Sequence, residues 1–494
     1  MGRILIALMA VVPMASAIPA GADDHQLNIS IAGSVQGSGA EISAFDPITR
    51  KLFVTTGDGI DVYRVYNDGR IKAKGHIDVG GPVNSVDIHG GLVAVAVEAD
   101  PAAAPGSVVF LWAGSERILG SVVVGALPDM VTFTPDGGKV IVANEGEPND
   151  DYSVDPEGSV SIVTIHSWSP VVINATAETA GFDAFNDQID DLRDAGVRIF
   201  GPGASVARDL EPEYVAVSGD STTAYVTLQE NNALALVDID TASITNIVPL
   251  GYKDYSLPEN AIDASNTDGI DGNFQAYDNV VGMYQPDAIV WWDGYLFTAN
   301  EGDARDYEGY SEQTRVSDDG NPNSEYPLDP SFDLALLDEA LLGRLNTTTA
   351  SGDIDGDGDF EVIHSYGARS MAVWDSAGGL VYDTGNQTEQ AVLANGTWVD
   401  SRSDDKGSEP EGVTVGVVDG TPYVFLGLER TSDVVIFDAS TPTSPEIVRL
   451  ITAPTGAVSP EGLEFVSAAD SPTGTALLIV TYEVSQTIVV FELG

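Results

Sequence analysis

Short apolar runs with alternating polar residues recur along the whole chain, and these runs are rich in Val, Ile, Thr and Tyr. Asp-Gly and Pro-Asp-Gly sequences separate them. The pattern is typical of short antiparallel strands joined by tight turns. Aligning the runs exposes one repeated unit of strand, turn, strand, loop and strand, usually followed by a fourth strand. Five clear copies and two weaker ones begin at Leu127, Glu211, Gln285, Glu409 and Ser459, and at Glu41 and Pro82.

Repeats of about 40 residues with four short strands are the signature of a β-propeller blade. One blade cannot bury both of its faces, so the blades must pack radially around an axis. The sequence therefore predicts an all-β fold, a seven-bladed β-propeller that forms a single domain over residues 27–494. The last unit, which ends at Gly494, supplies only three strands. We expect residues 27–32 (LNISIA) to complete it as the outer strand and so to lock the ring.

Three stretches do not fit the repeat, and we expect them to be loop insertions that contain short helices. They are residues 166–210, with a helix in FDAFNDQIDDLRDAG, residues 251–284, and residues 307–408, with a helix near SFDLALLDEALLGRL and a further pair of strands. Loops carry binding and catalytic residues more often than the scaffold does.

An acidic corner recurs at the ends of the predicted inner strands, as in ANEGEPNDDY (residues 143–152) and ANEGDARDY (residues 299–307). The first strand of five units starts with Pro and an acid, at Asp129, Glu213, Asp287, Glu411 and Glu461. The second strand of six units ends near a Glu, at Glu98, Glu145, Glu230, Glu301, Glu429 and Glu483. Antiparallel inner strands bring these ends together. We therefore predict up to eleven carboxylates around one mouth of the central channel, with Ile42 and Thr56 breaking the pattern in the first unit.

Carboxylates gathered so closely cannot all stay ionised without compensation. Either several are protonated or cations fill the site. Many hard oxygen ligands favour Ca²⁺, which takes about 6–8 oxygens in flexible geometry; another divalent metal is the alternative. The competing interpretation is that each acid only caps its own strand by accepting backbone N–H bonds.

A second acidic cluster has the spacing of a calcium loop. The segment DIDGDGDFE places acids at alternate positions, at Asp353, Asp355, Asp357, Asp359 and Glu361. It matches the first nine positions of the loop, but His364 stands at position twelve in place of a bidentate Glu. We predict a Ca²⁺ loop outside an EF-hand, against the alternative of an acidic surface turn. Asp263, Asp268 and Asp271 form a weaker candidate.

Charge limits the partners that this chain can take. It carries 76 acidic and 21 basic residues, a formal net charge of −55. Nucleic acid and anionic membranes are disfavoured, because their phosphates would be repelled. The scarce basic residues near the acids include Arg305, Arg369 and Arg430, together with Arg402 and Lys406. They are either counter-charges for neighbouring acids or, beside bound cations, a site for a phosphate or carboxylate ligand.

The N-terminus predicts export. Arg3 precedes an apolar run, and small residues around Ala17 to Ala22 offer cleavage sites, as in a signal peptide over residues 1–22. No later segment approaches transmembrane length. The chain has no Cys, so it has neither disulfides nor thiolate metal sites. We expect a secreted, periplasmic or extracellular protein.

Two functions follow from these residues. The first is a secreted calcium-binding propeller that acts at an extracellular surface or matrix, with divalent cations and a mineral, matrix or phosphate-bearing ligand as partners. The alternative is a metal-dependent phosphomonoesterase, in which channel metals polarise a phosphoryl oxygen and Arg305, Arg369 or Arg430 neutralises the transition state. The sequence contains no nucleophile elbow, phosphate-cradling loop or HExxH motif.

Long motifs such as VANEGEPNDDYSVDPEGSVSIV, EPEGVTVGVVDGTPYVFLGLER and SPEGLEFVSAADSPTGTALLIVTYEVS resemble the choice-of-anchor I family over nearly the whole mature chain. That family includes exported bacterial proteins often labelled alkaline-phosphatase-like, and it is similar to mesenchyme-specific cell-surface glycoproteins of skeleton-forming echinoderm cells. The resemblance implies a surface or exported protein, and the biomineral association fits calcium binding. Family members typically carry a C-terminal anchoring tail; because this chain ends at the last predicted strand, we expect free secretion.

Overall fold

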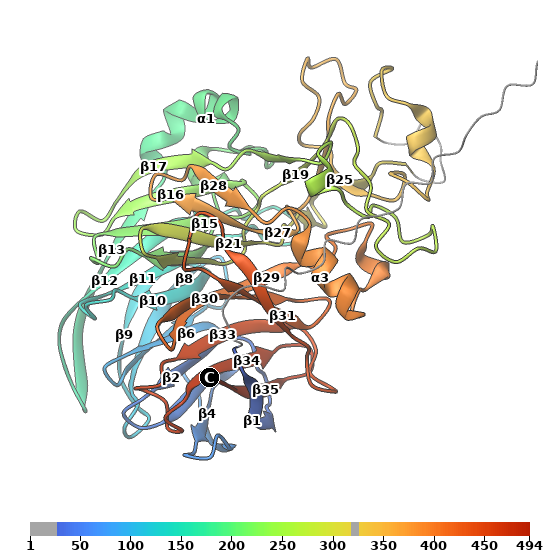
Figure 1. Ribbon diagram of the computed structural model, residues 1–494. Coiled ribbons are helices and arrows are strands. Elements are labelled where there is room, and N and C mark those ends of the chain that lie inside the picture. Colours follow the sequence, from blue (N-terminus) through green and yellow to red (C-terminus); the bar gives the residue numbers. More distant parts are fainter. Residues whose placement is uncertain (1–26, 318–325) are drawn as a thin grey trace, which may run out of the picture.

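The computed structural model describes residues 27–317 and 326–494 (Figure 1). The predicted signal peptide lies outside the described residues. Nearly all regular structure is β-strand, and most strands belong to seven four-stranded antiparallel sheets. A strand, a tight turn and the next strand follow one another in each sheet, as the repeated Asp-Gly turns predict.

The first four sheets follow the chain without interruption. Their strands are β2 (Ser43–Asp46), β3 (Lys51–Thr56), β4 (Gly59–Val65) and β5 (Ile71–Ile77); β6 (Val83–His89), β7 (Leu92–Val97), β8 (Pro105–Trp112) and β9 (Arg117–Ala126); β10 (Pro128–Phe133), β11 (Lys139–Asn144), β12 (Ser159–Ser169) and β13 (Val172–Gly181); and β14 (Pro212–Val217), β15 (Thr223–Leu228), β16 (Ala233–Asp238) and β17 (Ser243–Pro249).

Two of the last three sheets contain strands that are not consecutive in the sequence. The strands of these three sheets are β20 (Ile289–Trp292), β21 (Tyr295–Asn300), β27 (Ser370–Asp375) and β28 (Leu380–Asp383); β29 (Pro410–Val418), β30 (Thr421–Leu428), β31 (Asp433–Asp438) and β32 (Glu446–Ile451); and β33 (Pro460–Val466), β34 (Ala476–Tyr482), β35 (Thr487–Leu493) and β1 (Ile29–Gln36). The fifth sheet continues from β21 to β27, and the seventh sheet is completed by β1 from the beginning of the chain.

The outer strand of the last sheet comes from the other end of the chain. Strand β1 pairs antiparallel with β35, with Ile29 opposite Leu493 and Val35 opposite Ile488. This confirms that the segment beginning at Leu27 completes the last unit. The first strands of the seven sheets contact one another in chain order, β2, β6, β10, β14, β20, β29 and β33, and β33 contacts β2. The molecule is therefore an all-β protein with the radial organisation of a β-propeller.

The cores lie between neighbouring sheets. The second strands are buried on both faces, as in β7 (LVAVAV) and β34 (ALLIVTY), where every residue is buried. Apolar clusters join the sixth and seventh sheets, through Phe425, Ile436 and Leu478 among others, and the second and third, through Phe110 and Val142. Each fully buried Val, Leu or Ile side chain contributes about 1.5–3 kcal/mol, so packing between sheets supplies most of the stability.

Residues between the repeats build a separate small sheet. Its order is β18 (Tyr252–Asp254), β19 (Val280–Met283), β26 (Ile363–Ser365), β25 (Asn346–Thr348) and β24 (Gln313–Arg315), and β19 pairs with β26 in parallel. An apolar core that includes Tyr255, Phe332 and Phe360 packs against this sheet. A hairpin of β22 (Asp306–Tyr307) and β23 (Tyr310–Ser311) follows β21 in the sequence. Two ranges expected as insertions contribute strands to the main sheets: β27 and β28 complete the fifth sheet, and β12 and β13 extend to Gly181.

Helices are short and lie in the connections. The helix predicted in residues 182–196 is present as η1 (Asp183–Gln188) and α1 (Ile189–Ala195). The remaining helices are α2 (Val206–Asp209), α3 (Gln387–Asn395), η2 (Pro258–Asn260), η3 (Leu334–Leu337) and η4 (Asp400–Arg402). In the part of the chain that the structure describes, no helix has the length and apolarity needed to cross a membrane.

The prediction of a helix near SFDLALLDEALLGRL is wrong, because only the single 3-10 turn η3 forms there. Asp333 caps that turn by accepting from the Ala335 N–H. Asp338 then leaves the helical region (φ −59°, ψ 137°), and its Oδ1 accepts from the Ala340 N–H at 2.9 Å. The second aspartate thus starts a new turn where a helix would continue, which is how Asp side chains compete with helical hydrogen bonding.

Candidate cation sites

A cavity of about 180 Å³ lies where the starts of the first strands meet. Each of the seven sheets contributes to its wall a residue at or near the start of its first strand. These residues are Ile42, Asn84, Asp129, Glu213, Asp287, Glu411 and Glu461. In five sheets the pairing register shifts at this position, as between Pro128 and Met130 and between Pro460 and Leu463. Such bulges re-aim a side chain, and four of the five lie at acids that line the cavity, while the fifth lies at Asn84.

Six carboxylates line this channel cavity, because Glu145 at the end of β11 joins the five acids of the first strands. Among the described residues none of the six forms an ion pair with Lys, Arg or His. Glu213 Oε2 and Glu411 Oε2 are buried without any hydrogen-bond partner. A strand cap would accept backbone N–H bonds, so these two oxygens do not behave as caps.

Burial is the main cause that raises the pKa of these carboxyl groups, and their neighbours' charges add to it. The pKa of Asp129 rises to about 7. The pKa values of Glu213, Asp287, Glu411 and Glu461 lie well above the ordinary range, and each faces other acids of the same cavity. The cavity must therefore hold protons or cations at neutral pH.

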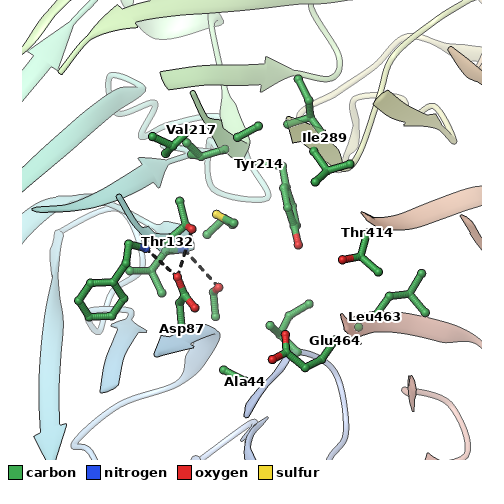
Figure 2. Close-up of a pocket in the computed structure, with 18 of the residues that line it drawn as sticks. Ala44, Asp87, Thr132, Tyr214, Val217, Ile289, Thr414, Leu463 and Glu464 are labelled. Atoms are coloured by element: carbon green, nitrogen blue, oxygen red, sulfur yellow. Dashed lines mark hydrogen bonds between the residues drawn. The ribbon is translucent and has the colours of Figure 1, made fainter. Parts of the chain in front are cut away.

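A second cavity, of about 310 Å³, adjoins the channel cavity, and Ile42, Ser85, Met130 and Tyr214 line both. Figure 2 shows the Tyr214 hydroxyl directed into this second cavity, with Asp87, Thr414 and Glu464 around it. Asp87 Oδ2 accepts from the Phe133 N–H at 2.7 Å, and Glu464 Oε1 accepts from the Phe45 N–H at 3.2 Å. Burial raises the pKa of Glu464 to about 8.

Sequence reasoning missed Asp87 and Glu464, although a signal was present. Each lies three residues after the position that lines the channel cavity, Asn84 or Glu461. The same offset recurs around the second cavity at Thr132, Ala216, Val290 and Thr414.

The acids at the ends of the second strands do not all share one opening. Glu98 lines an open cavity of about 660 Å³ with Glu147. Glu230 is 5% exposed, its Oε2 has no partner, and burial raises its pKa to about 7. Glu483 acts at a distance, since its charge helps to raise the pKa of Glu461. The predicted ring of eleven acids is thus divided, and six of them line one cavity.

Glu301 and Glu429, two members of the predicted ring, lie close together with Glu409, which the prediction did not include, while Glu145 lies in the channel cavity. Basic residues compensate this trio. Lys406 Nζ lies 2.6 Å from Glu301 Oε1, Arg430 Nη1 lies 2.7 Å from Glu429 Oε1, and Arg402 Nη2 lies 2.7 Å from Glu409 Oε1. Three cations for three carboxylates favour an ion-pair network over a metal site here.

The two ANEG corners, in the third and fifth sheets, meet each other. The rings of Tyr152 and Tyr307 pack edge to face at 5.6 Å, and the Gly309 N–H donates to the Asp150 carbonyl at 2.8 Å. The Tyr307 hydroxyl donates to Glu147 Oε1 at 2.8 Å. The repeated motif thus builds a bridge between the sheets on either side of the fourth.

The three arginines considered for phosphate binding are engaged in the structure. Arg305 is 1% exposed and pairs with Asp209 at 2.7 Å and Glu211 at 2.8 Å. Arg369 is equally buried and donates to the Asp263, Ser403 and Asp405 carbonyls. Arg430 pairs with Glu409 and Glu429. This geometry favours the counter-charge interpretation over a phosphomonoesterase.

The predicted calcium loop gathers its acids. Ligand oxygens of Asp353, Asp355, Asp357 and Glu361 all lie within 4.8 Å of one another. Gly356 and Gly358 have φ values of 79° and 100°, which only glycine adopts without strain. The Gly356 N–H donates to Asp353 Oδ1 at 2.7 Å, so the backbone is already folded around the first ligand.

One predicted ligand of this loop falls in another group, and the residue at position twelve lies away from the loop. Asp359 joins Asp329 and Glu361 in a second, adjacent group. His364 lies buried in β26, with its ring 4.7 Å from that of Tyr252, and burial lowers its pKa to about 4. It supplies no twelfth-position ligand. In the weaker candidate, Asp263 and Asp268 accept local N–H bonds from Ser265 and Ile270, as turn-capping residues do.

Comparison with known proteins places these sites in context. A family model described as the choice-of-anchor I domain matches residues 41–442. The mesenchyme-specific cell surface glycoprotein of Strongylocentrotus purpuratus is 26% identical over 330 residues, which is 57% of this chain and 40% of that protein. Gigasin-3a of Magallana gigas is 26% identical over 186 residues, 31% of this chain and 65% of that protein. The chain thus spans less than two thirds of these relatives.

Solved structures are similar only at a general level. Hydrazine synthase of Kuenenia stuttgartiensis has a TM-score of 0.48 at 12% identity, and the alignment covers 93% of this chain and 96% of the hydrazine synthase chain. The WD40 domain of Toxoplasma gondii coronin has a TM-score of 0.47 at 11% identity, and the alignment covers 95% of this chain and 86% of the coronin chain. Likeness at this level carries no functional information.

Proposed function

Because the chain belongs to the choice-of-anchor I domain family, we propose that it is an extracellular or surface protein that binds calcium and acts at a cell surface or in a matrix. Support for the location comes from the family and from the name of a relative, a cell surface glycoprotein. The signal peptide predicted in residues 1–22 agrees with it. In this proposal the seven sheets are the seven blades of one ring, which the cyclic contacts of their first strands support.

The observation that carries calcium binding is the loop from Asp353 to Glu361. Four carboxylates converge within 4.8 Å at the first, third, fifth and ninth positions of a calcium-loop spacing. Ca²⁺ needs about 6–8 oxygens, and the backbone carbonyl at the seventh position with water would complete the set. Mg²⁺ demands stricter octahedral geometry and gives up its water reluctantly, so calcium fits this loop better.

The channel cavity is the second cation site of the proposal. Within residues 27–317 and 326–494 its six carboxylates have no basic residue in an ion pair, whereas the neighbouring trio of Glu301, Glu409 and Glu429 has three. A cation that entered would compensate the charge of carboxylates whose pKa is raised by burial and, to a smaller extent, by their mutual repulsion.

The experiment is calorimetric titration of the chain with Ca²⁺, and of the variant Asp355→Asn/Asp357→Asn. Both substitutions keep the side-chain shape and remove two negative ligands. We expect one binding event to weaken by at least about tenfold, or ~1.4 kcal/mol. Calcium should also raise the melting temperature of the native chain, because a ligand that binds only the folded state stabilises it.

The matched control is Asp191→Asn/Asp194→Asn, which removes the same charge from exposed positions on α1. Equal calcium affinities of the loop variant and the control would overturn the assignment of the loop. A melting temperature that is the same in chelator and in excess calcium would overturn the proposal as a whole.

A further inference from the structure

Basic residues are concentrated in one hairpin of this acidic chain. Residues 50–74 hold six of the 21 Lys and Arg residues but only three of the 76 acids, so this segment is net positive in a chain with a net charge of −55. The hairpin consists of β4, its turn and β5. Within it, Arg64, Arg70, Lys72 and Lys74 are all exposed. We call these four residues the cationic hairpin.

The cations of this hairpin stand around one aromatic ring. The guanidinium carbons of Arg64 and Arg70 lie 5.7 and 5.8 Å from the centre of the Tyr66 ring, and the Lys74 ammonium lies 5.6 Å from it. Cation–π contacts at this distance are favourable. Lys74, by its hydrogen bond, and the charges of Lys72 and Arg64 lower the pKa of Tyr66, as expected of a positive local field.

Folding alone does not account for this arrangement. Arg64 lies directly opposite Lys72 in the β4–β5 pairing, and like charges in that position destabilise a sheet. Arg70 has a carboxylate partner, Asp68, at 2.6 Å. Among the described residues, Arg64, Lys72 and Lys74 have none. In a chain with more than three acids for every base, unpaired cations held side by side point to an external anion.

Protection of an exposed sheet edge is the other common role of lysines, since β5 is an outer strand. The other outer strands show that this chain does not protect its edges in that way. Strands β9, β13, β17, β28, β32 and β1 together carry only two basic residues, Arg117 and Arg449. The concentration on β4 and β5 is therefore specific to this hairpin.

We propose that the cationic hairpin binds a linear anionic polysaccharide, through sulfate or carboxylate groups along the polymer. Three of the four cations, Arg64, Arg70 and Lys74, lie around the Tyr66 ring, and Lys72 is paired with Arg64 across the two strands. Arg and Lys both bind sulfate and carboxylate groups by charge-assisted hydrogen bonds. At physiological ionic strength charges are screened within about 8 Å. A thin glycan strand that lies on this hairpin therefore experiences the local cations more strongly than the distant acids.

Other anionic partners fit less well. A second copy of the chain brings its own net charge of −55, so two copies repel each other over their whole surfaces. A nucleic-acid duplex carries one charge per ~1.7 Å of axis, so its phosphates would be repelled by the rest of a chain with a net charge of −55.

The site is separate from the calcium loop. Figure 1 shows β4 at the bottom edge of the molecule, close to β1, whereas the insertion around β25 lies at the top. Glycan binding can therefore be measured in chelator, where the proposed calcium sites are empty, and its outcome is independent of them.

The test measures the fluorescence anisotropy of a labelled heparin-derived decasaccharide, and of a labelled polyuronate that carries carboxylates only, mixed with the full chain in EDTA. We expect the native chain to bind at least one of the two probes, with an affinity that falls as salt rises. The variant Arg64→Gln/Lys72→Gln/Lys74→Gln should bind at least about tenfold more weakly. Its melting temperature should be unchanged or higher, because the substitutions remove a repulsion. The single variant Lys74→Gln should show an intermediate loss.

The control variant Arg117→Gln/Arg208→Gln/Arg449→Gln removes three exposed cations from other sheets and connections and so has the same net charge. It should bind as the native chain does. Equal losses in the two triple variants would show that only overall charge matters and would overturn the proposal. So would binding of neither probe, binding that requires calcium, or tighter binding of a DNA duplex of equal charge.

Discussion

Glu213 and Glu411 are the residues on which the channel cavity depends most directly. Each keeps one buried carboxylate oxygen without a partner, and neither has a basic neighbour in an ion pair among the described residues. A buried charged group without partners costs the folded state free energy. Each such residue therefore destabilises the metal-free protein and would help to hold a bound cation.

The variant Glu213→Gln/Glu411→Gln should consequently show two effects of opposite sign. In EDTA at mildly alkaline pH, the free energy of unfolding should rise by about 1–3 kcal/mol, because two partnerless buried carboxyl groups, whose ionisation opposes folding, are gone. In excess calcium, the stabilisation by the metal should shrink. Urea unfolding in the two buffers measures both effects. Glu178→Gln/Glu446→Gln, at exposed sites, is the control; a destabilised variant in EDTA would show that the acids are needed as strand caps.

Single residues were the hardest part of the site to predict. The recurrence of Pro-acid pairs identified the positions that line the channel cavity, because every sheet places that position alike. The same reasoning placed all six second-strand Glu residues, Glu145, Glu301 and Glu429 among them, around one mouth, since it treated all second-strand ends as equivalent. Lys406 and Arg430 draw Glu301 and Glu429 toward Glu409, and this local pairing is not visible in the repeat.

Strands were predictable where the repeat was regular, and less so elsewhere. The alternation within β29, β33 and the segment at Leu27 marks them as strands by itself. Strands β27 and β28 lie far along the chain from β21, so spacing could not assign them to the fifth sheet. The helix expected around Leu334 fails because Asp338 offers the backbone an alternative hydrogen bond.

Strand β1 is the element that joins the chain's beginning to its end, and its contact with the first sheet can be tested at Gly33. A Cβ at Gly33 would lie 2.5 Å from the Gly69 carbonyl oxygen in the β4–β5 turn. Gly33→Ala should therefore destabilise the protein by about 1–3 kcal/mol, as overpacking does. Gly75→Ala in β5 is the control, because nothing lies within 4 Å of the added methyl. Equal urea midpoints for the two variants would show that the seam between β1 and the first sheet is loosely packed.

At the scale of the whole molecule, the buried acids should make stability depend on pH in an unusual direction. Burial raises the pKa of Asp129 and Glu230 to about 7 and that of Glu429 to about 8, whereas unfolded carboxyl groups titrate near 4. Between these values the folded state binds more protons than the unfolded state. The contribution of these three groups to the free energy of unfolding is therefore fully present below about pH 4 and is lost as pH rises through 7 to 8. His364, whose pKa is lowered to about 4, opposes this trend, but only up to its unfolded pKa of about 6.5.

We expect the melting temperature in EDTA to fall as pH rises from about 5 to 8. Each of these groups should lower the free energy of unfolding by about 1.4 kcal/mol per pH unit within the range between its unfolded and folded pKa. Excess calcium should flatten this fall, because a bound cation replaces the protons. Sodium chloride distinguishes the cavity from the acidic exterior: it screens exposed charges and barely reaches buried ones. If sodium chloride flattens the profile as well as calcium does, the pH dependence comes from surface repulsion, and the channel cavity holds no specific cation.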